Sequence, residues 1–381
     1  MKKLALIISA TILFFAACSS PDYLDKGAFV TLLGNDTLAV EEYIITDSTI
    51  TTQVVLRSPE TQISTYLLEF DEFGGMESLL QTNHAPAVGF SDEGATARYI
   101  TKLGDSLRVD VFSDDGDMNS YTAPYEPGTL PFIDMVHWPF EVAFQNAVES
   151  GQDTVNQPML SGNRISNFVI AAIEGDSMTI RHPFRGVMGV NVTNQGGIHH
   201  LDAGLTTRKL RVHRVKDLNM PELAERFARN PVGELSGAIS AEFQFKGTNF
   251  RVEFGSPQKR GRDLFGNIVP WGERWRTGAN RATHFYTSND LMFGNLKVPA
   301  GEYTLFTIPE PDGGTLIINN QTGQNGRSYD QGRDLGRVPM QISTKDEVTE
   351  AFTISVEETK SGGQIDLIWG NTVFSTDFTV L

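Results

Sequence analysis

The chain almost lacks cysteine: its 381 residues contain one, Cys18. A single cysteine cannot form a disulfide within the chain, and once it is modified it leaves no thiol nucleophile for catalysis. We therefore expect the fold to be stabilised by a buried apolar core rather than by cross-links. The 40% of hydrophobic residues can supply such a core.

Long apolar runs are absent beyond the N-terminus. Lys2 and Lys3 precede an apolar stretch at residues 4–15. This stretch is shorter than the roughly 20 residues that span a bilayer, and its basic start is typical of an export signal. The pattern therefore predicts a secreted protein whose body does not cross the membrane.

The apolar stretch ends in Phe15-Ala16-Ala17-Cys18, which resembles the lipobox of bacterial lipoproteins. It predicts a signal peptide over residues 1–17, a lipidated Cys18 and a polar tether over residues 18–26. The expected partner is a membrane, held through the lipid, and the expected location is the cell envelope, at the outer membrane on its periplasmic or surface face. The alternative is an ordinary secretory signal with a coincidental cysteine.

Basic residues are in deficit, with 31 Lys and Arg against 47 Asp and Glu, for a formal net charge of −16. Binding to nucleic acid depends on neutralising phosphates with Lys and Arg, so this balance argues against a nucleic-acid partner. The signatures of nucleotide sites and of the serine nucleophile elbow are also missing from the sequence. We expect no nucleotide and no cofactor.

Histidines are few and scattered, which argues against a metal site. His199 and His200 are adjacent, and neighbouring side chains on a strand point to opposite faces of the sheet. A tetrahedral zinc site needs its ligands to converge on one point. The sequence therefore predicts no metal ion.

Most of the chain alternates apolar and polar residues with the period of a β-strand. Leu107, Val109 and Val111 are one such run, and glycine-rich turns separate the runs. Two segments have helical spacing instead: one around Phe140 and Phe144, and one that begins after Asn219, a residue suited to capping a helix. The fold class predicted is mainly β, with antiparallel sheets.

We expect two β-rich domains joined by a short helix. An N-terminal domain would cover residues 27–216 as a curved, half-barrel-like sheet, a shape similar to that of periplasmic lipid carriers. A connecting helix and linker would occupy residues 217–235, ending in the helix-breaking cluster Asn230-Pro231-Val232-Gly233. A C-terminal β-sandwich would fill residues 236–381.

The C-terminal part carries several distinctive motifs in a fixed order. They are Ser256-Pro257-Gln258-Lys259-Arg260-Gly261-Arg262, Val269-Pro270-Trp271-Gly272, Trp275-Arg276-Thr277-Gly278-Ala279-Asn280 and Val298-Pro299-Ala300-Gly301-Glu302-Tyr303. Together they resemble the domain of unknown function 2911 family of exported bacterial proteins, over residues 236–381. The resemblance names a family and implies no activity.

Basic and aromatic residues gather within this segment, although the chain as a whole is acidic. Guanidinium groups pair with carboxylates and phosphates, and indole rings stack on sugars. The pattern favours a surface for an anionic ligand, whose candidate residues are Arg260, Arg262, Trp271, Trp275, Arg276, Asn280, His284, Tyr329 and Asp330. The alternative is that the arginines pair with neighbouring acids and the tryptophans fill the core.

The function predicted from these features is a non-enzymatic binding or accessory lipoprotein for a lipid or an anionic glycan of the envelope. We name no catalytic residue for this reading. The alternative is a hydrolase of envelope glycans, in which Asp330 or Asp334 and His284 would act as acid and base. A structural scaffold without a ligand is the third possibility.

Overall fold

We analysed a computed structural model of the chain, which describes residues 24–91 and 93–381. The predicted signal peptide, Cys18 and most of the predicted tether lie outside the described residues. Strands account for 59% of the chain and helices for 8%, which confirms the mainly β fold class. Neither of the described α-helices has the length and apolar character needed to cross a membrane.

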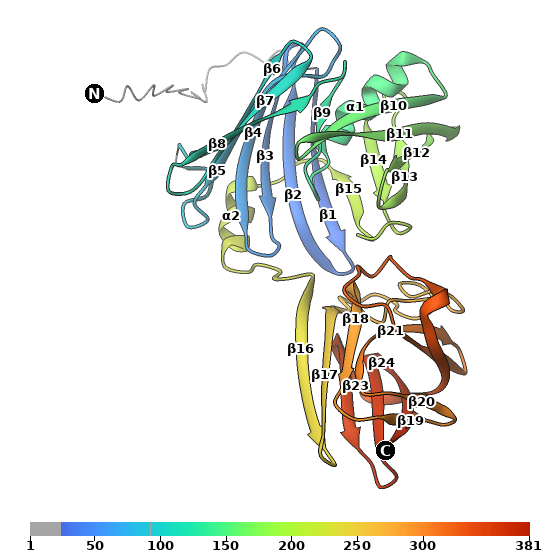
Figure 1. Cartoon of the computed structure of the whole chain (residues 1–381). Coiled ribbons are helices and arrows are strands. Elements are labelled where there is room, and N and C mark those ends of the chain that lie inside the picture. Colours follow the sequence, from blue (N-terminus) through green and yellow to red (C-terminus); the bar gives the residue numbers. More distant parts are fainter. Residues whose placement is uncertain (1–23, 92) are drawn as a thin grey trace.

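The strands form two sheets, shown one above the other in Figure 1. The first sheet contains fifteen strands: β1 (Asp25–Leu33), β2 (Asp36–Ile45), β3 (Thr49–Leu56), β4 (Gln62–Phe70), β5 (Met76–His84), β6 (Ala95–Leu103), β7 (Ser106–Phe112), β8 (Met118–Pro124), β9 (Leu130–Pro131), β10 (Thr154–Ser161), β11 (Arg164–Glu174), β12 (Ser177–His182), β13 (Gly186–Val192), β14 (Ile198–Asp202) and β15 (Arg211–Val215).

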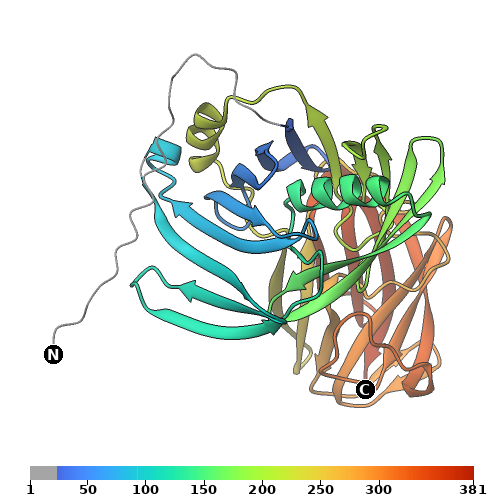
Figure 2. The same cartoon turned by 90° about the horizontal axis from the view of Figure 1, so that it is seen from above.

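The first sheet consists of two antiparallel meanders joined by the pairing of one strand from each. One runs from β1 outward to β8, the other runs from β9 back to β15, and β1 pairs with β15 between them. Only β9 and β10 pair in parallel. The predicted alternation is confirmed in β7, where Leu107 and Val109 are buried. The sheet curves around a helix, as the view from above shows (Figure 2).

That helix is α1 (Trp138–Ser150), which confirms the helix predicted around Phe140 and Phe144. It is buried on nearly all sides: Trp138, Phe144 and Ala143 have almost no exposed surface and belong to the core of the first sheet. Burying side chains such as Trp138 and Phe144 stabilises the fold by roughly 1.5–3 kcal/mol each. The concave side of the sheet is therefore occupied by α1.

Two buried carboxylates fix α1 to the sheet. Glu41 of β2 accepts hydrogen bonds from the backbone N–H groups of His137, at 2.8 Å, and Trp138, at 3.0 Å. Glu141, on the helix itself, accepts one from Ile198 N–H at 2.8 Å and one from the Tyr43 hydroxyl at 2.9 Å, and it pairs with Arg214. Burial raises the pKa of Glu141, although the charge of Arg214 opposes that effect.

The second helix, α2 (Met220–Ala228), begins at Asn219, as predicted, and the Asn219 side chain accepts a hydrogen bond from Glu222 N–H. It packs on the convex side of the first sheet, where Met220, Ala224 and Phe227 meet Val40 and Val55. A short 3-10 turn, η1 (Gly89–Ser91), adjoins it. The segment between the sheets is thus attached to the first sheet.

The second sheet contains nine strands and a second short 3-10 turn. They are β16 (Ser236–Phe245), β17 (Thr248–Pro257), β18 (Ala279–Thr287), β19 (Leu291–Phe293), β20 (Leu296–Val298), β21 (Gly301–Glu310), β22 (Gly313–Asn319), η2 (Gln331–Arg333), β23 (Asp334–Glu358) and β24 (Gly363–Val380).

The long strand β23 gives the second sheet its sandwich-like form. Its first part pairs with β22 and the rest pairs with β24. The sheet thereby encloses one apolar core, in which Phe352, Trp369 and Phe374 are almost completely buried. The structure thus confirms that this part of the chain has a β-sandwich-like fold, as predicted.

The two sheets meet at one end of β1. The turn between β1 and β2 contacts the loop that follows β17: Asn35 N–H donates to the Arg260 carbonyl at 2.9 Å, and the Arg260 guanidinium pairs with Asp36. Gly34 has a φ of 61°, and a Cβ there would collide with the Arg260 carbonyl, so glycine is required. We call this region the junction.

We predict that replacing Glu141 by Gln lowers the free energy of unfolding by about 3 kcal/mol, because it keeps the shape of the side chain but leaves Arg214 without its buried partner. Urea-induced unfolding followed by tryptophan fluorescence would measure the change. Glu149→Gln, an exposed position on the same helix, is the control and should change little. Equal stability of the two variants would contradict the role given to Glu141.

Candidate functional site

The two tryptophans predicted for the ligand surface, Trp271 and Trp275, lie in different surroundings. Trp275 is partly buried and packs against the core of the second sheet, with its ring parallel to that of Trp369 (centroids 6.1 Å apart, 11° between planes), and its Nε1 donates to the Gly278 carbonyl. Trp271 is 37% exposed and stacks on Phe265. Only Trp271 therefore offers an exposed indole.

Arg260 and Arg262 lie at the junction and are engaged in internal bonds. Arg260 pairs with Asp36, and its backbone N–H donates to Glu350. Arg262 donates to the carbonyls of Lys259 and Gln258. Burial, and the neighbouring charge of Arg260, lower the pKa of Arg262. Both residues add positive charge to the junction, while their hydrogen bonds shape the loop.

Asn280 and His284 support the backbone. The Asn280 side chain donates to the Ser236 carbonyl at 3.1 Å, and its φ is 62°. His284 is buried: its Nδ1 lies 2.8 Å from the Ala282 carbonyl, and its Nε2 accepts from Gly323 N–H at 2.8 Å. Both ring nitrogens of His284 are thus in use.

Tyr329 and Asp330 belong to a separate cluster near η2. The Tyr329 hydroxyl donates to the Asp334 carboxylate at 2.7 Å, and Arg337 donates to the same carboxylate at 3.0 Å. Asp330 caps η2 by accepting from Gly332 N–H. The Arg274 guanidinium lies 3.9 Å from the centre of the Tyr329 ring.

Arg276 differs from these residues because a second cation, Arg327, lies near its guanidinium group. It is half-buried beside Gly326, and among the described residues its one polar contact is a long hydrogen bond of 3.4 Å to the Asn280 carbonyl. Burial, and the charge of nearby Arg327, lower the pKa of Arg276. Within the described part of the chain, neither Arg276 nor Arg327 forms an ion pair with a carboxylate.

Arg327 connects the second sheet to the first. Its guanidinium donates to the Phe184 carbonyl, in the turn between β12 and β13, and to the Thr207 hydroxyl at 3.3 Å, in the loop between β14 and β15. The same turn and loop pack tightly, since a Cβ at Gly186 would lie 2.6 Å from the Leu205 carbonyl. These contacts place Arg327 at the edge of a cavity in the first sheet.

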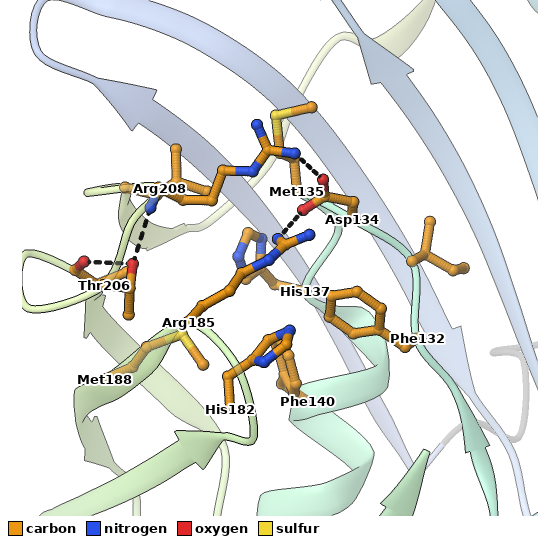
Figure 3. A pocket seen from close by; sticks show the side chains of 13 residues that line it. Phe132, Asp134, Met135, His137, Phe140, His182, Arg185, Met188, Thr206 and Arg208 are labelled. Carbon is orange, nitrogen blue, oxygen red and sulfur yellow. Dashed lines mark hydrogen bonds and ion pairs between the residues drawn. The ribbon is translucent and has the colours of Figure 1, made fainter. Parts of the chain in front are cut away.

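We call this space the junction cavity; it measures about 30 Å³. Three connections of the first sheet enclose it: the segment from β9 to α1, the β12–β13 turn and the β14–β15 loop. Figure 3 shows the side chains that line it. They are Phe132, Ile133, Asp134, Met135, His137, Phe140, His182, Arg185, Met188, Ala203, Thr206, Arg208 and Leu210.

The open end of the junction cavity is polar. Asp134, Arg185 and Arg208 have side chains that are 25–36% exposed, and both guanidinium groups bind the one carboxylate (Figure 3). Burial acts to raise the pKa of Asp134, but the hydrogen bond from Arg185 and the charge of Arg208 outweigh it and lower the pKa. One carboxylate shared by two guanidinium groups leaves an excess of positive charge.

His182 contributes a neutral donor beside these charges. Burial, together with the charge of Arg185, lowers the pKa of the His182 imidazole to about 4. Phe184 N–H donates to His182 Nδ1 at 3.1 Å, so the proton of the neutral ring is on Nε2. At neutral pH the ring therefore presents an N–H group without a net charge.

The closed end of the junction cavity contains His137, which is 3% exposed. Its Nδ1 lies 3.1 Å from the Thr31 hydroxyl and 3.4 Å from Glu41, the carboxylate that also holds the start of α1. Its Nε2 has no hydrogen-bond partner among the residues that the structure describes. Phe140, Ala203 and Leu210, all buried, surround it with apolar atoms.

Sequence reasoning did not select the residues of the junction cavity. Asp134, His137, His182, Arg185 and Arg208 come from three distant connections, and no spacing in the sequence links them. The clearest available signals were short polar turns with two basic residues, such as Arg181 and Arg185 in one and Arg208 and Lys209 in another. Similar turns are common on protein surfaces.

We predict that acidification destabilises the protein partly through His182. An unfolded histidine takes up a proton near pH 6.5, but folded His182 does so only near 4, so between these values the unfolded chain binds more protons. The free energy of unfolding therefore falls as the pH falls through this window. His182→Gln removes this contribution, so its urea midpoint should fall less than that of the wild type between about pH 7 and about pH 5.

His199→Gln is the matched control, because His199 has an exposed side chain. That variant should keep the wild-type pH dependence. A wild-type response in His182→Gln would exclude the assigned role of His182.

Comparison with known proteins adds one finding. No curated protein matches the chain. Residues 236–378, which make up almost the whole second sheet, match a family model described as a protein of unknown function, DUF2911, and this match confirms the family resemblance of the C-terminal part of the chain.

Proposed function

We propose that the protein is a lipid-anchored binding protein of the cell envelope and that it binds an anionic ligand, such as an acidic glycan, at the junction of its two sheets. The N-terminal pattern of residues 1–18 supports the anchor and the location. The charges and contacts at the junction support the ligand class.

The observation that carries this proposal is the arrangement of Arg276 and Arg327. Two like charges lie close together, and no described carboxylate pairs with either of them. Holding two unpaired cations together costs free energy, and an anion between them would remove that cost. Guanidinium groups also match the geometry of carboxylate and phosphate oxygens.

The surroundings of this pair are also basic. Seven cations gather at the junction, while the carboxylates that face them are Asp36, Asp134, Asp202 and Glu350. The seven are Arg185, Arg208, Lys209, Arg260, Arg262, Arg276 and Arg327. On a chain of net charge −16, such a local excess attracts an anion to this place rather than to the surface in general.

Other ligands and activities receive less support. An apolar ligand in the curved sheet would have to share the concave side with α1, which is packed there. For a hydrolase, His284 would need a free ring nitrogen, and both are bonded to the backbone. Asp334 is bound by Tyr329 and Arg337. Binding without catalysis is therefore the function we favour.

We predict that Arg276→Gln and Arg327→Gln each weaken binding of tetragalacturonate, a carboxylated oligosaccharide, roughly tenfold, since a hydrogen bond to a charged group contributes about 1.5–3 kcal/mol. Isothermal titration calorimetry of the purified protein would measure the affinities. Maltotetraose, a neutral oligosaccharide, should bind weakly to every form.

Arg251→Gln is the control variant. Arg251 lies on β17 near the β16–β17 hairpin and faces Glu253 and Glu302, so its loss should leave the affinity unchanged. If Arg276→Gln and Arg327→Gln bind tetragalacturonate as tightly as the wild type does, the junction is not the binding surface.

We predict that Cys18→Ser moves the protein from the membrane fraction to the soluble fraction, because lipid anchoring depends on the cysteine. Metabolic labelling with a palmitate analogue should mark the wild type and not the variant. Labelling of Cys18→Ser, or its retention in the membrane fraction, would show that the anchor is elsewhere.

A further inference from the structure

The junction cavity combines three features that together specify a ligand more closely than its charge alone. Cations lie at its open end, its volume is that of a very small group, and its closed end is lined by the imidazole of His137, a residue that is 3% exposed. This inference rests on the proposed function, since the ligand that reaches Arg327 would extend into this cavity.

The open end fits a carboxylate. Among the described residues, the guanidinium groups of Arg185 and Arg208 donate hydrogen bonds to Asp134 alone, and a guanidinium has five N–H donors. Donors therefore remain at the open end, and the Nε2–H of His182 adds a further one. An acceptor with two oxygens in one plane suits such a set.

The closed end fits a hydroxyl group. A volume of about 30 Å³ admits one or two groups the size of a water molecule. His137 is the polar residue there, and its Nδ1 lies 3.4 Å from Glu41, a carboxylate that accepts hydrogen bonds; this neighbour favours the tautomer with the proton on Nδ1. Nε2 is then an acceptor on the lining of the cavity, next to the apolar side chains of Phe140 and Leu210, where a hydroxyl donor is favoured over an apolar group.

We infer that the junction cavity binds a carboxylate with an adjacent hydroxyl group, the hydroxy-acid arrangement. The carboxylate lies against Arg185 and Arg208, and the hydroxyl donates to His137 Nε2. Aldonic acids have this arrangement of groups, so the cavity would take the hydroxy-acid end of a glycan whose remainder lies along Arg327 and Arg276.

Two small acids of equal size separate this ligand class from anions in general. Glycolate carries a hydroxyl where propionate carries a methyl group, and the two have the same number of heavy atoms. A site that offers a buried acceptor discriminates strongly against a ligand that lacks the donor. We expect glycolate to bind roughly tenfold more tightly than propionate.

Methionine side chains of this protein can report binding directly. Met135 and Met188 line the cavity, whereas Met220 and Met340 are buried in other parts of the fold. In protein labelled with ¹³C at the methionine methyl groups, glycolate should shift the Met135 and Met188 resonances and leave those of Met220 and Met340 in place. The same spectra show whether each variant is folded.

Arg208→Gln should weaken glycolate binding, and Arg251→Gln should not. Equal affinity for glycolate and propionate, or shifts outside the cavity only, would overturn the inference. If tetragalacturonate still binds through Arg276 and Arg327 in that case, the proposed function survives without the hydroxy-acid site. If glycolate is selected and tetragalacturonate does not bind, the cavity is supported and the glycan proposal fails.

Discussion

The rest of the structure depends on how α1 is held inside the curved first sheet. Glu41 binds the start of the helix and Glu141 binds its middle, and both carboxylates are almost completely buried. An unpaired buried carboxylate would be very unfavourable, so these bonds allow few alternative positions for the helix. Because α1 is fixed, the segment before it is fixed too, and Asp134 and His137 meet the β12–β13 turn in a defined geometry.

Charge is distributed unevenly over the molecule, and the distribution follows the architecture. The chain as a whole is acidic, while Arg185, Arg208, Arg276 and Arg327 gather where loops from the two sheets meet. Each sheet supplies part of the set: Arg185 and Arg208 come from the first, and Arg276 and Arg327 from the second. Neither sheet alone would present all four guanidinium groups. A site at the contact of two sheets can therefore change with their relative placement.

The sequence was informative wherever local chemistry decides the structure. The alternation around Leu107 predicted a strand, and Asn219 marked the start of α2, because strand period and helix capping act over a few residues. The loop context of Trp271, between Pro270 and Gly272, favoured its exposure, but the sequence could not tell that Trp275 packs against the core, because its neighbours Phe352 and Trp369 are distant in the sequence. The junction cavity depends on contacts between connections some fifty to seventy residues apart, such as Arg208 with Asp134, and sequence spacing carries no record of such contacts.

The direction of β1 has a consequence for where the proposed anchor joins the fold. The described chain starts at one end of this strand, and the strand ends at the junction. Nine extended residues span about 30 Å. The lipid that we propose at Cys18 would therefore be attached to the chain before the end of β1 that lies far from the junction, so the anchor and the proposed ligand would be bound at opposite ends of one strand.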